Sequence, residues 1–380
     1  LFASTAVAVA VVGPSPALAA DAAGSTTVTS VDELIVTANK REESLHDVAM
    51  ALTAVSEEEL QRTGATGFAD YLTQVPGVSF TGAAQGAGTL TIRGINAGGV
   101  AATVGVYVDE TPFGSRTALV NASVLATDIN PFDMKRVEVL KGPQGTLYGA
   151  GALGGVVRYI SNAPSTAGFA SEVEVGAQSV AHGGEGWETN GMINMPLGDK
   201  AAVRVTGFYQ DRPGFIDDVA HGLKDINSAQ VYGGRISLLL EPTDKLSLRL
   251  TAMSQDIRDA AAADEDIFTP TSPSDFRPLF GNRIYTDAVP STLQPRYRVD
   301  YRLYNATANW DMGWAKLVSS TSYGTLDFLQ YFDFSALTGP GDLLSNQVNQ
   351  DKFTQEVRLA SSGDGKLQWQ GGLYYTRETG

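Results

Sequence analysis

Three glycines, Gly149, Gly151 and Gly154, have the GxGxxG spacing of loops that hold the phosphates of a dinucleotide, and Glu174 follows at roughly the distance of a ribose-binding acid. Such a loop requires a helix to begin at the glycines, because the helix N-terminus holds the pyrophosphate. The segment from Val156 to Ile160 instead contains β-branched and aromatic residues, which favour a strand. We therefore expect these glycines to serve tight turns and close backbone packing.

Other catalytic and metal-binding patterns are missing from the sequence. The chain has no cysteine, which excludes disulfides and thiolate chemistry. Its three histidines, His46, His182 and His221, are scattered and form no HExxH motif. There is no GxSxG motif and no compact carboxylate pair at a defined spacing. These observations predict that the protein is not an enzyme and carries neither a metal nor a cofactor.

Composition narrows the class of protein further. The 380 residues carry a formal net charge of -15, which makes a nucleic acid an unlikely partner on electrostatic grounds. Glycine, at 41 residues, exceeds the usual share of about 7%, and charged residues, at 18%, fall below the average. This balance favours an extended β architecture.

The first 20 residues read as the remnant of a signal peptide. An apolar run from Leu1 to Val12 precedes the small-residue pattern Ala17, Leu18, Ala19. No later segment contains 18 uninterrupted apolar residues. An exported chain of this kind is either soluble or a β-barrel, because only helices and closed barrels satisfy every backbone group in lipid.

Residues 21–164 divide into a polar leader and a compact mixed α/β domain. Residues 21–43 should be flexible around VDELIVTA (31–38), which is either a strand added to a partner's sheet or an ordinary first strand. Residues 44–164 should form the compact domain. A capping box at Ser56 and Glu59 starts one helix, and a second is expected over 67–74. Strands are expected over 89–93, 104–108, 136–140 and 156–160.

After Pro164 the pattern changes to strands near the roughly 9 to 11 residues that cross a bilayer. Short turns at 196–200, 241–245, 311–314 and 362–366 alternate with long polar loops at about 211–227, 255–297 and 329–351. That asymmetry is typical of an outer-membrane barrel. We expect about nine antiparallel strands over 165–380, so that the barrel stops before it closes. Alternation places Ser247, Arg249 and Thr251, and likewise Thr354, Glu356 and Arg358, on the lumen side.

The order of motifs resembles the N-terminal half of a TonB-dependent outer-membrane receptor. VDELIVTANKREESLHDVAMALTAVSEEEL is similar to the TonB box and plug entry, and LTIRGI and VGVYVDETP to plug strands. RVEVLKGPQGTLYGAGALGGVVRYIS is similar to the closing plug signature, and FTQEVRLAS to a barrel strand. The resemblance implies an α+β plug domain followed by an antiparallel transmembrane β-barrel, truncated at about nine strands, in the outer membrane of a Gram-negative cell.

The resemblance also assigns roles to individual residues. The TonB box would be Glu33, Leu34, Ile35, Val36, Thr37 and Ala38. The plug motif would comprise Gly94, Asp109, Glu138, Lys141, Gly142, Pro143, Gly145, Tyr148 and Gly149. A polar lock would join plug cations Arg93 and Arg158 to Glu356 of the barrel, although Glu356 could equally be a solvated lumen charge. Candidate ligand contacts are Gln85, Asn96, Phe113, Arg116, Phe268, Phe280 and Tyr285, for which an ordinary loop role is the alternative.

The function implied is import of a scarce extracellular ligand, by default a ferric siderophore, driven by the TonB energy-coupling complex of the inner membrane. A carbohydrate or an aromatic compound is an alternative ligand. A passive outer-membrane porin and an exported soluble enzyme or adhesin are alternative functions. The porin would need neither a plug nor an N-terminal box.

Overall fold

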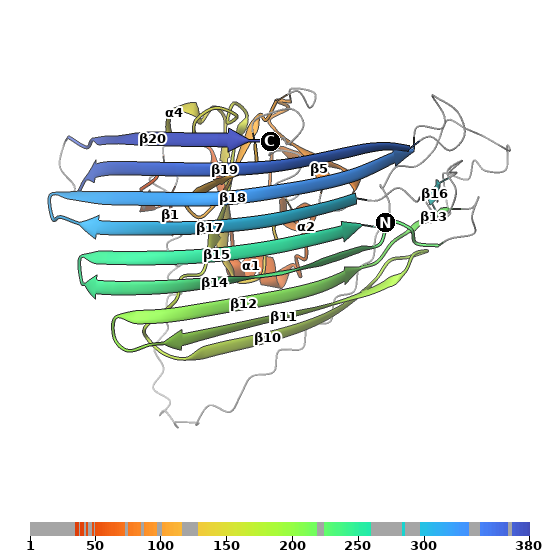
Figure 1. Cartoon of the computed structure of the whole chain (residues 1–380), viewed down its shortest axis with the longest axis horizontal. Helices are drawn as coiled ribbons and strands as arrows, with labels where there is room; N and C mark the ends of the chain where they lie inside the picture. Colours follow the sequence, from red (N-terminus) through yellow and green to blue (C-terminus); the bar gives the residue numbers. More distant parts are fainter. Residues whose placement is uncertain are drawn as a thin grey trace, which may run out of the picture.

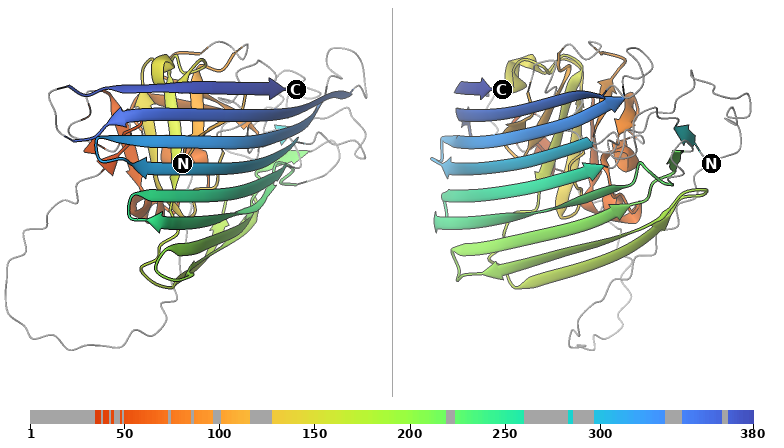
Figure 2. Two further views of the ribbon diagram at one scale, coloured as in Figure 1. Left: turned by 60° about the vertical axis from the view of Figure 1, so that its left-hand side comes forward. Right: turned by 45° about the vertical axis from the view of Figure 1, so that its right-hand side comes forward.

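The computed structural model describes residues 35–37, 39–41, 43–44, 48, 50–72, 75–84, 87–96, 101–115, 128–218, 224–259, 283–285, 297–333, 343–363 and 367–380. They form a small α/β domain, the plug, on the concave side of a large curved sheet, the wall (Figures 1 and 2). This arrangement confirms the predicted order of a mixed domain followed by antiparallel strands. No helix among the described residues is both long and apolar enough to cross a membrane.

The plug is built on a five-stranded sheet in the order β3-β8-β9-β6-β7. Its strands are β3 (Leu52–Ser56), β6 (Val104–Val108), β7 (Thr111–Phe113), β8 (Met134–Lys141) and β9 (Gly155–Ser161). The pair β6 and β9 is parallel, and the other neighbours are antiparallel. All four strands predicted in this domain are present, with ends shifted by no more than two residues.

Shorter elements complete the plug. They are β1 (Ile35–Val36), β2 (Glu43–Ser44), the hairpin β4 (Val78–Ala84) and β5 (Ala87–Ile92), and helices α1 (Glu57–Arg62), α2 (Phe68–Leu72) and α4 (Gly145–Tyr148). Ser56 caps α1 by accepting from the Glu59 backbone N–H at 3.3 Å, as the capping box predicts. Among the described elements of the plug, the sequence pattern did not predict helix α4 or strands β2, β3, β4 and β7.

The glycine-dense segment behaves as a turn between strands. Helix α4 ends before Gly149 instead of beginning there, and the next element is strand β9, which starts at Gly155. Gly149 adopts a φ of +75°, which favours glycine. At Gly155 an added Cβ would lie 2.2 Å from the Leu140 carbonyl oxygen, so the close approach of β8 to β9 requires glycine. The dinucleotide interpretation therefore lacks the helix on which it depends.

The wall contains nine antiparallel strands in the order β10-β11-β12-β14-β15-β17-β18-β19-β20. They are β10 (Ala170–Ser179), β11 (Glu185–Pro196), β12 (Ala201–Arg212), β14 (Ala229–Thr243), β15 (Leu246–Asp259), β17 (Tyr297–Asp311), β18 (Ala315–Asp333), β19 (Leu343–Ser361) and β20 (Gln370–Thr379). A separate short pair joins β13 (Ile216–Asp218) to β16 (Arg283–Tyr285). The expected domain boundary at residue 164 lies in the connection between β9 and β10.

The expected short turns lie at one end of the wall, at the left of Figure 1, and the long connections lie at the other. The predicted loop over 329–351 is mostly wrong, because β18 runs to Asp333 and β19 starts at Leu343. The β19 extension is largely polar, yet the backbone groups of both extensions pair from Asp333↔Leu343 onward. A strand outside lipid needs hydrogen-bond partners in the sheet but no apolar face. The polar sequence of β19 therefore looked like that of a loop.

A single hydrophobic core joins the plug to the inner face of the wall. Plug residues Phe68, Tyr71 and Ile129 belong to the same buried cluster as wall residues such as Ile257 and Tyr301. Below this apolar region, towards the short turns, the contact between plug and wall is made by charged side chains.

Candidate functional site

The N-terminal segment after β1 contacts both the plug and the wall. Thr37 donates its backbone N–H to Glu138 Oε1 at 2.9 Å, and its carbonyl accepts from Arg158 Nη1 at 2.7 Å. Three residues later, Lys40 turns the chain with a φ of +55° and extends its side chain to Glu356 on β19. Arg41 donates to the Gln368 side chain at 3.1 Å. This short segment is therefore attached both to the plug and to the wall.

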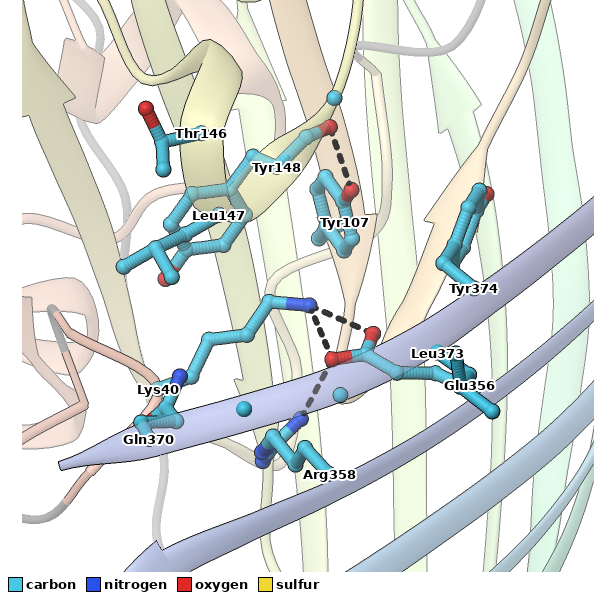
Figure 3. Close-up of a pocket in the computed structure, with 13 residues that line it drawn as sticks. Lys40, Tyr107, Thr146, Leu147, Tyr148, Glu356, Arg358, Gln370, Leu373 and Tyr374 are labelled. Atoms are coloured by element: carbon cyan, nitrogen blue, oxygen red, sulfur yellow. Dashed lines mark hydrogen bonds and ion pairs between the residues drawn. The ribbon is translucent and has the colours of Figure 1, made fainter.

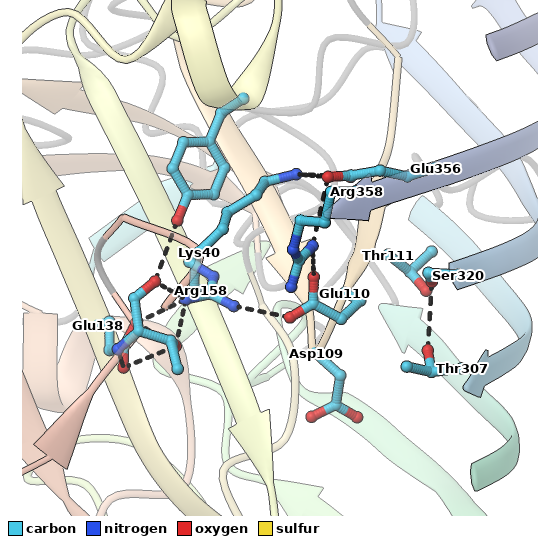
Figure 4. A network of polar contacts seen from close by, with 12 residues as sticks. Lys40, Asp109, Glu110, Thr111, Glu138, Arg158, Thr307, Ser320, Glu356 and Arg358 are labelled. Atoms are coloured by element: carbon cyan, nitrogen blue, oxygen red, sulfur yellow. Dashed lines mark hydrogen bonds and ion pairs between the residues drawn. The ribbon is translucent and has the colours of Figure 1, made fainter. Parts of the chain in front are cut away.

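The Lys40 contact begins an alternating series of charges, which we call the ion-pair chain; Figure 4 labels all of its members except Arg136. Its members, in order of contact, are Lys40, Glu356, Arg358, Glu110, Arg158, Glu138 and Arg136. The sheet register explains part of it, because Glu138 and Arg158 are opposite each other on β8 and β9. Glu356 and Arg358 are two residues apart on β19 and so share its inner face.

The charged atoms of neighbouring members of the ion-pair chain lie close together. Lys40 Nζ lies 2.5 Å from Glu356 Oε2, and Arg358 Nη1 lies 3.2 Å from Glu356 Oε1 and 2.6 Å from Glu110 Oε2. Arg158 lies 3.6 Å from Glu110 and 2.9 Å from Glu138. Because most members are buried, the loss of one partner would leave a charge without compensation in a medium of low polarity.

The surroundings shift the proton affinities of the plug members. Burial acts to raise the pKa of Glu110, but Arg358 and Arg158 outweigh it and lower that pKa from 4.5 to about 2. Burial lowers the pKa of Lys40, although Glu356 opposes this effect. Burial raises the pKa of Tyr148 to about 12. Near neutral pH, Glu110 is thus ionised and Tyr148 is protonated.

Two tyrosine rings enclose the Lys40 ammonium group. Its Nζ lies 5.2 Å from the centre of the Tyr148 ring and 5.8 Å from that of Tyr107. The Tyr107 hydroxyl donates to the Tyr148 carbonyl at 2.9 Å. Figure 3 shows Lys40 and Glu356 on the lining of a cavity of about 310 Å³ between α4 and strands β19 and β20. The rings hold the cation by cation–π attraction.

A second group of plug–wall ion pairs has the same polarity as the Glu110–Arg358 pair and the reverse of the Lys40–Glu356 pair. Asp133, with a φ of +59°, accepts from Arg204 on β12 and from Arg235 on β14, the latter at 2.6 Å. Asp128 lies 2.8 Å from Arg212. Plug carboxylates therefore bind arginines that line the inner face of the wall. These contacts attach residues 128–133 of the plug to strands β12 and β14.

The predicted lock residues Arg93, Arg158 and Glu356 do not form the direct pairs that the sequence predicted. Arg158 and Glu356 belong to the same ion-pair chain, but Arg358 and Glu110 lie between them. Arg93 lies elsewhere: its side chain is exposed, and its charge is near Lys141, whose pKa is lowered by burial and by that charge. The direct pairing of either arginine with Glu356 is not what the structure shows.

The remaining predicted plug-motif residues mostly form turns. Gly94 and Gly142 have φ values of +74° and +101°. Asp109 accepts from the Ser161 backbone N–H at 2.9 Å and lies 3.6 Å from Arg249 of the wall. Pro143 precedes α4, which Gly145 begins. These residues shape the plug and carry no reactive group of their own.

The predicted TonB box is partly described. Ile35 and Val36 form β1, which pairs with β2 of the same chain, and Thr37 is bound as above. Glu33, Leu34 and Ala38 lie outside the described residues. Among the candidate ligand contacts, Asn96 is exposed and donates to Thr91. The Phe113 ring is buried edge-to-face against Tyr301, at 5.2 Å between centres, so it packs the plug against the wall. Gln85, Arg116, Phe268 and Phe280, and the side chain of Tyr285, are not described.

The sequence interpretation missed Lys40, Glu110, Asp128 and Asp133. A signal existed for two of them, because Glu110 adjoins Asp109 in the VGVYVDETP motif and Lys40 closely follows the box. No pattern signalled Asp128 and Asp133, because their partners are about 70 to 100 residues away in sequence.

Comparison with known proteins agrees with this architecture. Residues 44–156 match the family model described as TonB-dependent Receptor Plug Domain. The chain as a whole is similar to TonB-dependent outer-membrane receptors. Members of this family are receptors and transporters, not enzymes.

The similar proteins are named for different transported ligands. The chain is 31% identical over 195 residues, 50% of its length and 30% of the relative's, to the vitamin B12 transporter BtuB of Vibrio vulnificus. It resembles the crystal structure of the ferric yersiniabactin uptake receptor FyuA from Yersinia pestis, with a TM-score of 0.71 and 20% identity over 87% of this chain and 48% of that one. For the ferric-catecholate import receptor Fiu from E. coli K12 the TM-score is 0.64, with 17% identity over 88% and 50%. The chain thus spans about half the length of these solved structures.

Proposed function

We propose that this receptor imports a scarce extracellular ligand into the periplasm, driven by the TonB complex of the inner membrane acting on residues 33–38. The proposal rests chiefly on one observation. The box is attached to the plug through Thr37, and the segment that follows it is attached to the wall through Lys40. A pull on the box would therefore act directly on the ion-pair chain that holds the plug in the wall.

The geometry supports a sequence of events. Withdrawal of Thr37 removes two hydrogen-bond partners from the Arg158–Glu138 pair. Withdrawal of Lys40 leaves Glu356 with Arg358 alone among its described ion-pair partners. Each step weakens the next contact in the chain, because neighbouring charges share partners. In this proposal the ion-pair chain is the lock, with Glu356, Arg358 and Arg158 as its central members, and Arg93 lies outside it.

As the ligand we propose a ferric siderophore. The solved structures with the same fold include receptors for ferric yersiniabactin and ferric catecholates. The vitamin B12 transporter is the competing example, and a carbohydrate or an aromatic compound is also compatible with the family. A passive porin is disfavoured, because a plug attached by both groups of ion pairs would obstruct a diffusion channel.

The coupling proposal is tested by deletion of residues 31–38 from the protein expressed from its complete gene. Binding of a radiolabelled ferric chelate to whole cells should persist, and its accumulation in the periplasm should stop. Deletion of residues 21–28, which has the same length, is the control and should leave both unchanged. Normal accumulation after the first deletion would refute energised import.

A second experiment identifies the ligand independently of the coupling mechanism. Binding of ferric hydroxamates, ferric catecholates and ferric citrate to the native protein would be compared with binding of vitamin B12.

A further inference from the structure

Glu174, which the sequence pattern offered only as a possible ribose-binding acid, lies on the inner face of the wall. Residues of β10 alternate between exposed and half-buried, and the exposed Val173 and Val175 on either side of Glu174 face outward. On β11 the buried Asn190 faces inward, and Glu188, two positions away, shares its face. Both carboxylates therefore face the plug.

The sheet register places four inward positions at the corners of a square. Glu174 is opposite Asn190, and Gly176 is opposite Glu188. Because residues two apart along a strand share a face, these four are neighbours on the inner surface. Three corners carry side-chain oxygen atoms, and the fourth has no side chain. The Glu188 carboxylate extends over this fourth corner, since its Oε1 atom would lie 2.6 Å from a Cβ added to Gly176.

Each carboxylate is held by one amide group of the wall. Asn190 Nδ2 donates to Glu174 Oε2 at 3.1 Å, and Gln210 Nε2 donates to Glu188 Oε2, also at 3.1 Å. Asn190 is 5% exposed, and its Oδ1 atom is buried without a hydrogen-bond partner among the described residues. An amide oxygen can only accept, so this atom requires a donor or a cation beside it.

The charges of Glu174 and Glu188 are not compensated within the part of the chain that the structure describes. The two carboxylates repel each other, and neither forms an ion pair with a described residue. Arg212, whose charge acts on Glu188, is bound to Asp128 at 2.8 Å. In contrast, the carboxylates of both groups of plug–wall ion pairs each bind an arginine or a lysine. The pair on β10 and β11 therefore favours a cation from outside the chain.

A small cavity of about 30 Å³ separates this square from the plug. Its lining includes Glu174, Glu188 and Asn190 from the wall and Glu57, Gly64 and Asn130 from the plug. Asn130 is 3% exposed, and its Nδ2 atom has no hydrogen-bond partner among the described residues. The cavity can hold about two species the size of water, at about 10–15 Å³ each. Water alone would satisfy both amide atoms but would leave the carboxylate charges uncompensated.

We propose that Glu174, Glu188 and Asn190 bind a calcium ion that joins the plug to strands β10 and β11. Carboxylate and amide oxygens are the ligands that Ca²⁺ prefers, and its flexible coordination allows water to complete the shell. Mg²⁺ demands near-ideal octahedral geometry, which three ligands on one sheet surface suit less well. A water molecule on the ion can accept from Asn130 Nδ2, and this contact extends the site to the plug.

The calcium site is an attachment of the plug separate from both groups of ion pairs. Gln210, which holds Glu188, also donates to the Thr66 carbonyl of the plug at 3.2 Å. A cation that fixes Glu188 therefore also fixes a direct contact between plug and wall. The strength of this attachment depends on the calcium concentration of the medium, and it depends neither on the imported ligand nor on the coupling through the box.

The test uses the protein from its complete gene, purified in a non-ionic detergent. Equilibrium dialysis with radioactive Ca²⁺, in about 0.15 M NaCl to screen diffuse attraction, measures the bound calcium directly. The double variant Glu174→Gln, Glu188→Gln should bind one ion fewer than the native protein, whose site should have a Kd of about 0.1–1 mM. Asp199→Asn, Asp244→Asn, the matched control, removes two exposed carboxylates at the short turns and should bind as the native protein does. Most of the bound calcium should remain in the presence of an equal concentration of Mg²⁺.

Two variants separate the geometry of the site from its charge. Gly176→Val removes no charge, but its side chain displaces the Glu188 carboxylate and should weaken calcium binding roughly ten-fold or more. Asn190→Asp supplies a third carboxylate and should strengthen binding roughly ten-fold. Heat-modifiable gel mobility verifies that each variant is folded.

Hydrogen exchange reports whether the ion joins the plug to the wall. Calcium at about ten times its Kd should slow exchange over residues 60–66 roughly ten-fold in the native protein, because opening of this segment disrupts the site. The double glutamine variant should show no such response. Equal calcium binding by the native protein and that variant, binding that Gly176→Val leaves unchanged, or exchange over 60–66 that ignores calcium would each overturn the proposal. Absence of calcium binding would assign the two amide atoms to water.

Discussion

Lys40, only two residues beyond the predicted TonB box, forms a 2.5 Å ion pair with Glu356 in the middle of a wall strand, 316 residues later in the sequence. Both side chains are largely buried, with 5% and 13% exposed. The contact joins the wall to the segment on which an external pull would act. The wall must resist that pull. It is therefore the contact at which the proposed coupling is most directly tested.

Lys40→Met should loosen the N-terminal segment. Methionine keeps the length of the side chain but removes its charge, so Glu356 loses a partner and the box detaches more often. Because the sequence contains no cysteine, Leu34→Cys would provide a single reactive thiol. Its maleimide labelling rate should rise roughly ten-fold in the Lys40→Met background, equivalent to about 1.4 kcal/mol.

The matched control removes an exposed ion pair. Glu59→Gln breaks the surface pair with Arg62 and should leave the labelling rate unchanged, because exposed pairs contribute little. Glu356→Gln should act like Lys40→Met and should also increase hydrogen exchange in the plug. Unchanged plug exchange in Glu356→Gln would contradict its role in the lock.

Glu138→Gln should destabilise the plug. Glu138 is fully buried and accepts from Arg136, Arg158 and Thr37. Its neutralisation leaves Arg158 in a buried site with only Glu110, at 3.6 Å, as a described ion-pair partner, and such losses cost about 3–5 kcal/mol. Limited proteolysis in urea should show plug cleavage at a lower urea concentration than in the native protein. Glu59→Gln again serves as the control, and an unchanged urea dependence would argue against a stabilising role.

Acid should loosen the plug over a defined pH range. The pKa of Glu110 is lowered from 4.5 to about 2, with Arg358 and Arg158 outweighing the effect of burial. A carboxylate with a lowered folded-state pKa stabilises the protein above its unfolded pKa, and this contribution disappears as the pH falls through the folded value. Stability should therefore decline between about pH 4.5 and pH 2. Glu110→Gln should be less stable at pH 7 and show a shallower decline, whereas parallel pH profiles would contradict the assignment.

The sequence predicted what local patterns control. Ser56 and Glu59 specify the start of α1, and alternation correctly placed Thr354, Glu356 and Arg358 on the inner face of β19. The sequence could not specify which residues pair across the fold, because the contact of Lys40 with Glu356 depends on how the whole wall curves around the plug. The extensions of β18 and β19 were predicted as a loop, because the sequence of one segment does not reveal which strand it pairs with. Pairing across long distances is a property of the folded chain.

The two groups of plug–wall ion pairs should respond separately to mutation. The Asp133 side chain is 1% exposed and binds Arg204 and Arg235 on neighbouring strands, and it has no ion pair with a described member of the ion-pair chain. Asp133→Asn leaves both arginines without a full negative charge, so residues 128–134 should separate from the wall more often. Hydrogen exchange of this segment should therefore increase, while labelling of a cysteine at position 34 stays at the native rate. Lys40→Met should give the reverse result, with faster labelling and unchanged exchange over 128–134. If either variant changed both measurements equally, the plug would move as one rigid unit, and a pull on the box could not release one part while the other stays attached to β12 and β14.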